Sequence, residues 1–133
     1  MNKFALDTNI LIYSHDEKAG DKQNIARDLI VRSPIVSTQV VSEYISVLKR
    51  IMKIPKALIF NSCLPVLKRC QIQAVDMTTL QTAERLMLRY DFQIFDAIIV
   101  ASALDCGCQT LYSEDMQHKI KIDRQLTIVN PFV

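Results

Sequence analysis

The fold of this chain is decided near its start, by the stretch Lys3-Phe4-Ala5-Leu6-Asp7-Thr8-Asn9-Ile10-Leu11-Ile12-Tyr13. The apolar run from Phe4 to Leu6 does not alternate with polar residues, which predicts a short strand of a parallel sheet covered by helices on both faces. Asp7 follows at once, so its carboxylate is expected at the carboxyl end of that strand. That edge is where open α/β sheets bind their ligands. Taken alone, however, Asp7, Thr8 or Asn9 is most simply the N-cap of a short helix.

Length and composition indicate one ordinary globular domain over residues 1–133. Half of the residues are hydrophobic and 23% are charged, which argues against disorder. The net charge of +2 leaves room for a basic surface beside an acidic pocket, because total charge says nothing of distribution. Acidic residues interrupt the N-terminal region, so we predict no signal peptide. No apolar run is long enough to span a bilayer. We therefore expect a cytoplasmic protein with no membrane partner.

The rare residue types exclude several kinds of site. The four cysteines are spaced C-x6-C and C-x-C and the chain has two histidines, which does not fit a zinc site. A chain of this size without a secretion signal also needs no disulfides, so we interpret the cysteines as small buried or half-buried hydrophobic residues. Because Gly20 and Gly107 are the sole glycines, neither a P-loop nor a G-x-G-x-x-G dinucleotide turn can be present.

Further along the chain, strands and helices are expected to alternate. Strands are predicted at 35–37, 72–75, 110–112 and 126–129, each short and apolar. Helices are predicted between them, one capped by Thr38, one running from Pro55 with a kink at Pro65, and one capped by Thr78 or Thr79. The segment 94–105 is apolar nearly all round, so that helix is expected to be central. The predicted fold is a three-layer α/β/α arrangement around a mainly parallel sheet of about five strands.

Besides Asp7, the chain has three acids that stand beside apolar structure: Glu43, Asp96 and Asp115. Each has a plain structural explanation when taken alone. Glu43 lies at the edge of an apolar helix face and is read as solvated. Asp96 is a first-turn acid favoured by the helix dipole. Asp115 follows the strand 110–112 as a turn residue.

Considered together, the four acids predict a metal site. Asp7 and Asp115 both follow parallel strands and emerge at one edge of the sheet, and the helix starts that bear Glu43 and Asp96 point to the same edge. Four converging carboxylates would repel one another and raise each other's pKa values unless a cation intervened. An all-carboxylate set suits Mg²⁺ or Mn²⁺. Such a site suits metal-assisted hydrolysis of phosphodiesters.

The residues around these acids resemble those of the PIN-domain nucleases, and within them the VapC-type toxins of bacterial toxin–antitoxin pairs. The matching segments are Leu6-Asp7-Thr8-Asn9 with its apolar continuation, Ser42-Glu43-Tyr44, Phe95-Asp96-Ala97, and Tyr112-Ser113-Glu114-Asp115-Met116-Gln117. They occur in the family's order and at its spacing, so the resemblance covers essentially the whole chain. It implies a PIN-like fold and a metal-dependent endoribonuclease.

The resemblance also implies roles for single residues. Asp7, Glu43, Asp96 and Asp115 would be the catalytic and metal-binding quartet. Asp7 and Asp96 would be the firmest ligands, Asp115 would bind directly or through water, and Glu43 would orient a water molecule on the metal. Thr8, Asn9 and Ser113 would hold the carboxylates in place, as such sites generally require. Glu114 is left out because it should point away from its neighbour Asp115, and Asp91 because it precedes the Phe95-Asp96 motif.

The same resemblance implies the partners. They are an RNA substrate, a second copy of the chain in a homodimer or within a toxin–antitoxin complex, and a cognate antitoxin. A basic antitoxin side chain, such as Arg, would enter the acidic pocket and replace the charge of the metal. Cations outside the quartet must hold the RNA. The candidates are basic residues near the motif-bearing segments: Lys49, Arg50, Lys53, Lys119, Lys121 and Arg124.

Two other functions remain open on the sequence. The first is a non-catalytic protein-binding module with the same fold. The second is a domain in which a strand-end aspartate accepts a phosphoryl group. A dehalogenase-type site of that kind has D-x-D after its first strand, whereas Asn9 holds the second position here. A receiver-type site needs an aspartate after a middle strand, and none follows 35–37.

Overall fold

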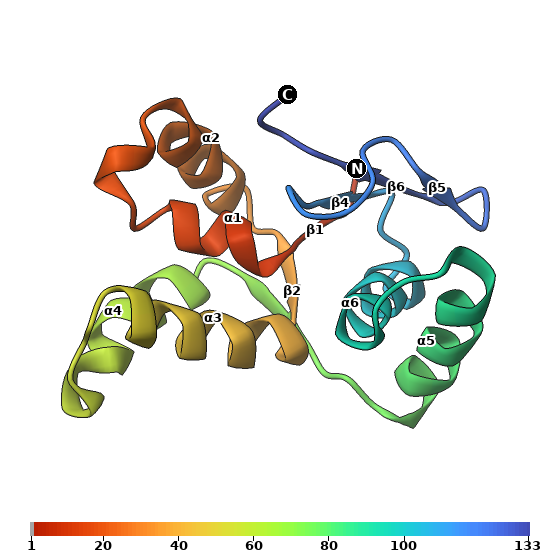
Figure 1. Ribbon diagram of the computed structural model, residues 1–133, viewed down its shortest axis with the longest axis horizontal. Helices are drawn as coiled ribbons and strands as arrows, with labels where there is room; N and C mark the ends of the chain where they lie inside the picture. The colour runs from red at the N-terminus through yellow and green to blue at the C-terminus, as the bar shows by residue number, and fades with distance from the viewer. Residues whose placement is uncertain (1) are drawn as a thin grey trace.

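Strands alternate with helices throughout the part of the chain that the computed structural model describes, residues 2–133 (Figure 1). The elements are β1 (Phe4–Leu6), α1 (Thr8–Tyr13), η1 (Glu17–Ala19), α2 (Asp21–Ile30), β2 (Ile35–Ser37), α3 (Thr38–Ile51), η2 (Lys56–Leu58), α4 (Ile59–Leu67), β3 (Gln71–Gln73), α5 (Met77–Tyr90), α6 (Ile94–Asp105), β4 (Thr110–Tyr112), β5 (Lys121–Ile122) and β6 (Leu126–Val129). None of these helices is long and apolar enough to cross a bilayer.

The strands form one sheet in the order β3-β2-β1-β4-β6-β5. All neighbours are parallel except β5, which runs antiparallel to β6. From β1 the chain builds outward through β2 to β3, and it then returns to start the other half with β4 beside β1. The order therefore reverses between β1 and β4. In open parallel sheets such a switch point leaves a crevice at the carboxyl ends of the two strands, where ligands bind.

Helices cover the sheet and give it the buried core that the sequence predicts. Every residue of β1 and β2 is buried, as expected for strands that are covered on both faces. In α6 every residue from Ala97 to Leu104 is buried, which confirms that this helix is central. Figure 1 shows α5 and α6 on one side of β1 and β2, and α1 to α4 on the other. The predicted three-layer fold is confirmed, with six strands in place of about five.

Two predicted helix caps are wrong by one to three residues. The N-cap of α3 is Ser37, whose hydroxyl accepts the Val40 N–H at 3.2 Å. Thr38 instead accepts the Val75 N–H at 3.0 Å and so ties the segment after β3 to α3. Asp76 caps α5 and forms a reciprocal capping box with Thr79. Either a hydroxyl or a carboxylate can cap a helix, so the sequence alone does not choose among neighbouring candidates.

The weakest strand predictions concern the edges of the sheet. The strand predicted at 72–75 lies at Gln71–Gln73, and all of its residues are exposed. β5 is only two residues long and gives no periodic signal. The helix predicted from Pro55 is divided into η2 and α4, with Pro65 inside α4. All four cysteines are free thiols, as expected.

Candidate active site

Asp7 lies at the carboxyl end of β1 and is only 5% exposed. Its Oδ1 accepts the Thr8 N–H at 2.7 Å, which makes Asp7 the N-cap of α1. Its Oδ2 accepts a hydrogen bond from the Ser113 hydroxyl at 2.7 Å. Asp7 is therefore the N-cap that its local sequence indicates, and the same side chain belongs to the predicted quartet.

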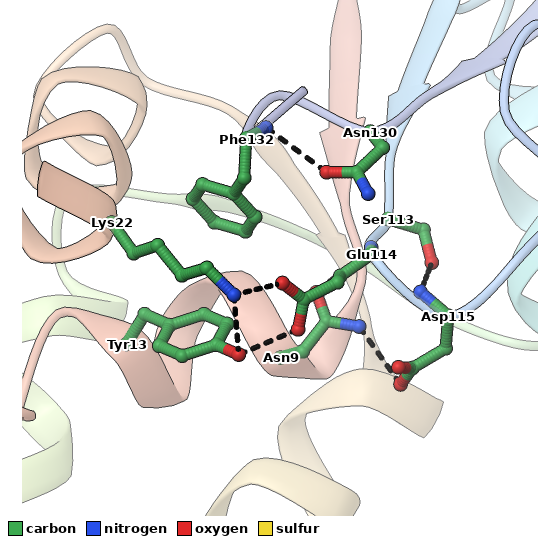
Figure 2. A network of polar contacts seen from close by, with 8 residues as sticks. All are labelled: Asn9, Tyr13, Lys22, Ser113, Glu114, Asp115, Asn130 and Phe132. Carbon is green, nitrogen blue, oxygen red and sulfur yellow. Dashed lines mark hydrogen bonds and ion pairs between the residues drawn. The ribbon is translucent and has the colours of Figure 1, made fainter. Parts of the chain in front are cut away.

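The segment after β4 brings Ser113 and Asp115 beside Asp7. Asn9 of α1 joins the two elements, because its Nδ2 donates to Asp115 Oδ2 at 3.0 Å and its Oδ1 accepts the Glu114 N–H at 3.3 Å (Figure 2). The Ser113 hydroxyl, besides donating to Asp7, accepts the Asp115 N–H at 3.2 Å. The contacts at Asn9 and Ser113 fix the loop that carries Asp115 to the loop that carries Asp7.

Glu43 and Asp96 approach from two further helices. Glu43 lies in α3, and its Oε2 accepts a hydrogen bond from the Thr8 hydroxyl at 2.8 Å. Its Oε1 lies 3.4 Å from the donor Gln39 Nε2. Asp96 is half-buried in the first turn of α6. Thr8, Asn9 and Ser113 thus donate hydrogen bonds to Glu43, Asp115 and Asp7 respectively.

All four acids border one cavity of about 700 Å³ at the switch point of the sheet. Thr8, Asn9 and Glu114 line it too, and no Lys, Arg or His is found among its lining residues within 2–133. The six basic residues considered as candidates for RNA contact are exposed but do not line the cavity. Asp91 is also absent from its lining and ends α5 in the left-handed conformation.

The charges of this cavity act on one another. Burial is the main cause that raises the pKa of Asp7 to about 6, against the hydrogen bonds from Ser113 and Thr8, and the charges of Asp96 and Glu43 raise it further. Burial also raises the pKa of Asp96, and the charges of Glu43 and Asp115 add to that effect. Each of the two acids therefore gives up its proton less readily than usual, mainly because it is buried and further because other carboxylates lie nearby.

The donor set is one that a hard divalent cation would satisfy. Carboxylate oxygens are the preferred protein ligands of Mg²⁺ and Mn²⁺, and the cavity offers them from four separate elements. As placed, no group of three His, Cys, Asp or Glu side chains within residues 2–133 has a geometry that could hold a metal ion. Binding one ion through three of these acids therefore requires their side chains to move together.

The structure also places at the cavity an acid that the sequence does not assign to it, Glu114. Glu114 does turn away from Asp115, as expected, but it still lines the cavity. There its carboxylate accepts hydrogen bonds from the Tyr13 hydroxyl at 2.5 Å and from Lys22 Nζ at 2.6 Å (Figure 2). Because Lys22 lies 92 residues from Glu114 in the chain, no local sequence pattern could predict this contact.

Comparison with known proteins agrees with this geometry. The PIN domain family matches residues 4–122. The chain therefore belongs to the PIN-domain family. No protein of curated function matches it in sequence.

Solved structures with this fold include several toxins. A toxin–antitoxin complex from Klebsiella pneumoniae has 19% sequence identity and a TM-score of 0.72, with 98% of each chain covered. VapC20 of Mycobacterium tuberculosis, a toxin that cleaves the sarcin–ricin loop, has 18% identity and a TM-score of 0.67, with 85% of this chain and 90% of VapC20 covered. VapBC2 of Rickettsia felis, bound to a DNA fragment from its promoter, has 18% identity and a TM-score of 0.67, with 96% of this chain and 98% of that chain covered. This chain thus has the fold of the VapC-type toxins.

Proposed function

We propose that this chain is a metal-dependent endoribonuclease and the toxin of a toxin–antitoxin pair, acting through Asp7, Glu43, Asp96 and Asp115. The observation that carries the proposal is the cavity at the switch point. It gathers these four acids from four elements and has no basic side chain among its described lining residues. In a purely structural site we would not expect four carboxylates without a basic side chain, because ionised carboxylates that lie close together and away from water destabilise the fold.

The residues divide the work. Asp7, which is buried, and Asp96, which is half-buried, would hold Mg²⁺ or Mn²⁺, with Asp115 binding directly or through water. When bound, the ion would lower the pKa of a water molecule and stabilise negative charge on the leaving oxygen. Glu43, which accepts a hydrogen bond from Thr8, would orient the attacking water. Ser113 and Asn9 keep Asp7 and Asp115 at a fixed separation.

The experiment compares RNA cleavage by the purified chain with Mg²⁺, with Mn²⁺ and with a chelator. Cleavage of a structured RNA is expected only with metal. Asp7→Asn and Asp96→Asn should abolish it. Asp28→Asn, which makes the same change at an exposed position of α2, is the matched control and should cleave normally. Cleavage that persists with chelator would refute the metal mechanism.

The partners are part of the same proposal. Structures with this fold have been solved as toxin–antitoxin complexes, which supports a cognate antitoxin for this chain. A gene for a small protein next to this one, whose product binds the chain and blocks cleavage, would establish that role. A homodimer is supported by exposed Leu80, Ile94 and Phe95 on α5 and α6. Sedimentation of the purified chain at several concentrations tests it.

A second function is kept because of one observation. Since no three acids are arranged around a single point in residues 2–133, a PIN fold that binds a protein without catalysis would also fit. The two functions differ in Mn²⁺ binding. Calorimetry with the metal-free chain should give saturable binding that Asp96→Asn removes if the chain is a nuclease. Absence of binding would favour the non-catalytic module.

A further inference from the structure

We propose that Lys22, Tyr13 and Glu114 form a tie that positions Asp115 at the acidic cavity, and that Lys22 is thereby a positioning residue for the cation. This inference rests on the proposed function, because it assigns Asp115 to the metal site. None of the three residues belongs to the quartet or to the side chains that hold it directly.

The loop that bears Asp115 needs such a tie. Residues 113–120 form no helix or strand, and Asp115 is itself exposed. Its carboxylate accepts one hydrogen bond in the described chain, from Asn9. The far end of the loop is attached by the Lys119 N–H to the Ile128 carbonyl at 2.7 Å. Near Asp115, the loop is held by the Ser113 hydroxyl, which accepts the Asp115 N–H, and by the buried side chain of Met116. Its neighbour Glu114 adds the contacts that reach α1 and α2.

Glu114 is bound from three directions. Its backbone N–H donates to Asn9 Oδ1. Tyr13 and Lys22 donate to its two carboxylate oxygens, as Figure 2 shows. Its partners come from α1 and α2, so the tie joins the loop after β4 to two helices of the first half of the sheet. In Figure 2 the Glu114 side chain points toward Tyr13 and Lys22, whereas the Asp115 carboxylate lies at Asn9. Holding Glu114 toward α1 and α2 therefore keeps Asp115 on the cavity that it shares with the other acids.

The lysine is placed more firmly than an ordinary surface lysine. Its Nζ lies 5.0 Å from the centre of the Tyr13 ring and 5.4 Å from that of Phe132, and the two rings pack edge to face. Cation–π contacts of this kind restrict an ammonium that would otherwise move freely. The side chain is nevertheless 42% exposed, so its pairing with Glu114 adds little to overall stability. The Lys22–Glu114 pair instead fixes the position of the Glu114 side chain.

The tie also keeps a fifth acid out of the site. Glu114 lines the same cavity as the quartet, and Lys22 places a positive charge 2.6 Å from it. Its carboxylate is thus neutralised and its two oxygens are occupied by donors. Within residues 2–133, the hydrogen bonds that the quartet accepts come from neutral donors only, so these acids keep the negative charge that a cation would meet.

The test uses a double variant, Lys22→Met with Glu114→Gln. It removes one positive and one negative charge, so the net charge is unchanged and long-range attraction of the ion is preserved. The matched control is Glu17→Gln with Lys18→Met, an exposed pair of the same chemistry on η1. Two quantities are measured on the metal-free protein: hydrogen exchange of peptides spanning 113–117, and the dissociation constant of Mn²⁺ by calorimetry.

The double variant should exchange faster over 113–117 and bind Mn²⁺ roughly tenfold more weakly, the usual effect of losing an outer contact of a metal site. The control should match the wild type in both. Lys22→Arg, which keeps a cation and donors beside Glu114, should match the wild type in hydrogen exchange over 113–117 and in Mn²⁺ affinity. In cleavage, the double variant should need more metal for half-maximal rate while its rate at saturating metal changes little.

Unchanged exchange over 113–117, or unchanged Mn²⁺ affinity, would overturn the tie. A wild-type chain that binds no Mn²⁺ would instead overturn the proposed function. In that case the exchange measurement alone decides whether Lys22 positions the loop, so the two failures are distinguishable. Similar melting temperatures for the double variant and its control would show that any loss is not caused by unfolding.

Discussion

Asp7→Asn is expected to stabilise the metal-free protein at pH 8 and to lose that advantage by pH 4. In the folded chain the pKa of Asp7 is raised from 3.8 to about 6, mainly by burial. Because the folded state binds the proton more tightly than the unfolded state, stability falls as the pH rises from about 4 through 6. The destabilisation is complete above about pH 7, where both states are ionised.

A shift of about two pKa units corresponds to roughly 3 kcal/mol of destabilisation by the ionised carboxylate. Asparagine keeps an acceptor for the Thr8 N–H but cannot accept from the Ser113 hydroxyl as well, which costs about 1 kcal/mol. The net gain at pH 8 is therefore roughly 2 kcal/mol, or about 8 °C in melting temperature for a domain of this size.

The assay is thermal unfolding of both proteins in chelator at unit steps from pH 4 to pH 8. Asp28→Asn, an exposed substitution of the same kind, should give no pH-dependent difference from the wild type. A difference between Asp7→Asn and wild type that stays constant across this range would refute the account of the buried charge. A stabilisation by Asp7→Asn that grows toward low pH would refute that account as well. Adding Mg²⁺ should narrow the gap, because only the wild type keeps its full ligand set.

Three further substitutions test other parts of the structure. Thr8→Val removes the hydroxyl that holds Glu43 and should lower cleavage at least about tenfold, with a nearly unchanged circular dichroism spectrum. Asp76→Ala removes the cap of α5 and its bond with Thr79, and should cost about 1 kcal/mol in urea unfolding. Leu111→Ala, at a fully buried position of β4, should cost roughly 2–5 kcal/mol in the same measurement.

The sequence predicts best what depends on periodicity. The apolar run of 94–105 announces a central helix because its side chains are apolar all round, and α6 is buried accordingly. β3 is predicted a residue or two too late, since the exposed Gln71, Ile72 and Gln73 belong to a longer, weakly alternating segment that does not mark where the strand begins or ends. Its position is set instead by pairing with β2, a contact between distant residues.

In the candidate site, too, some residues could be placed from the local sequence and others could not. Asp7 and Asp115 could be assigned to one edge because each follows a parallel strand, and they line one cavity. The partners of Glu114 could not be foreseen. Tyr13 and Lys22 are 101 and 92 residues away, and each is unremarkable in its own segment. Hydrogen bonds between such distant side chains depend on the finished fold and leave no local signal.

The hydrogen bond from Ser113 to Asp7 spans 106 residues, and this has a consequence for synthesis of the chain on the ribosome. Strand β1 leaves the ribosome long before its neighbour β4 is made. At about 5–20 residues per second, roughly 5–20 seconds separate the two. During that interval Asp7 lacks Ser113 and Asp115, so the acidic cavity is incomplete on the nascent chain. The activity proposed for this cavity would therefore be absent until nearly the whole domain has been made.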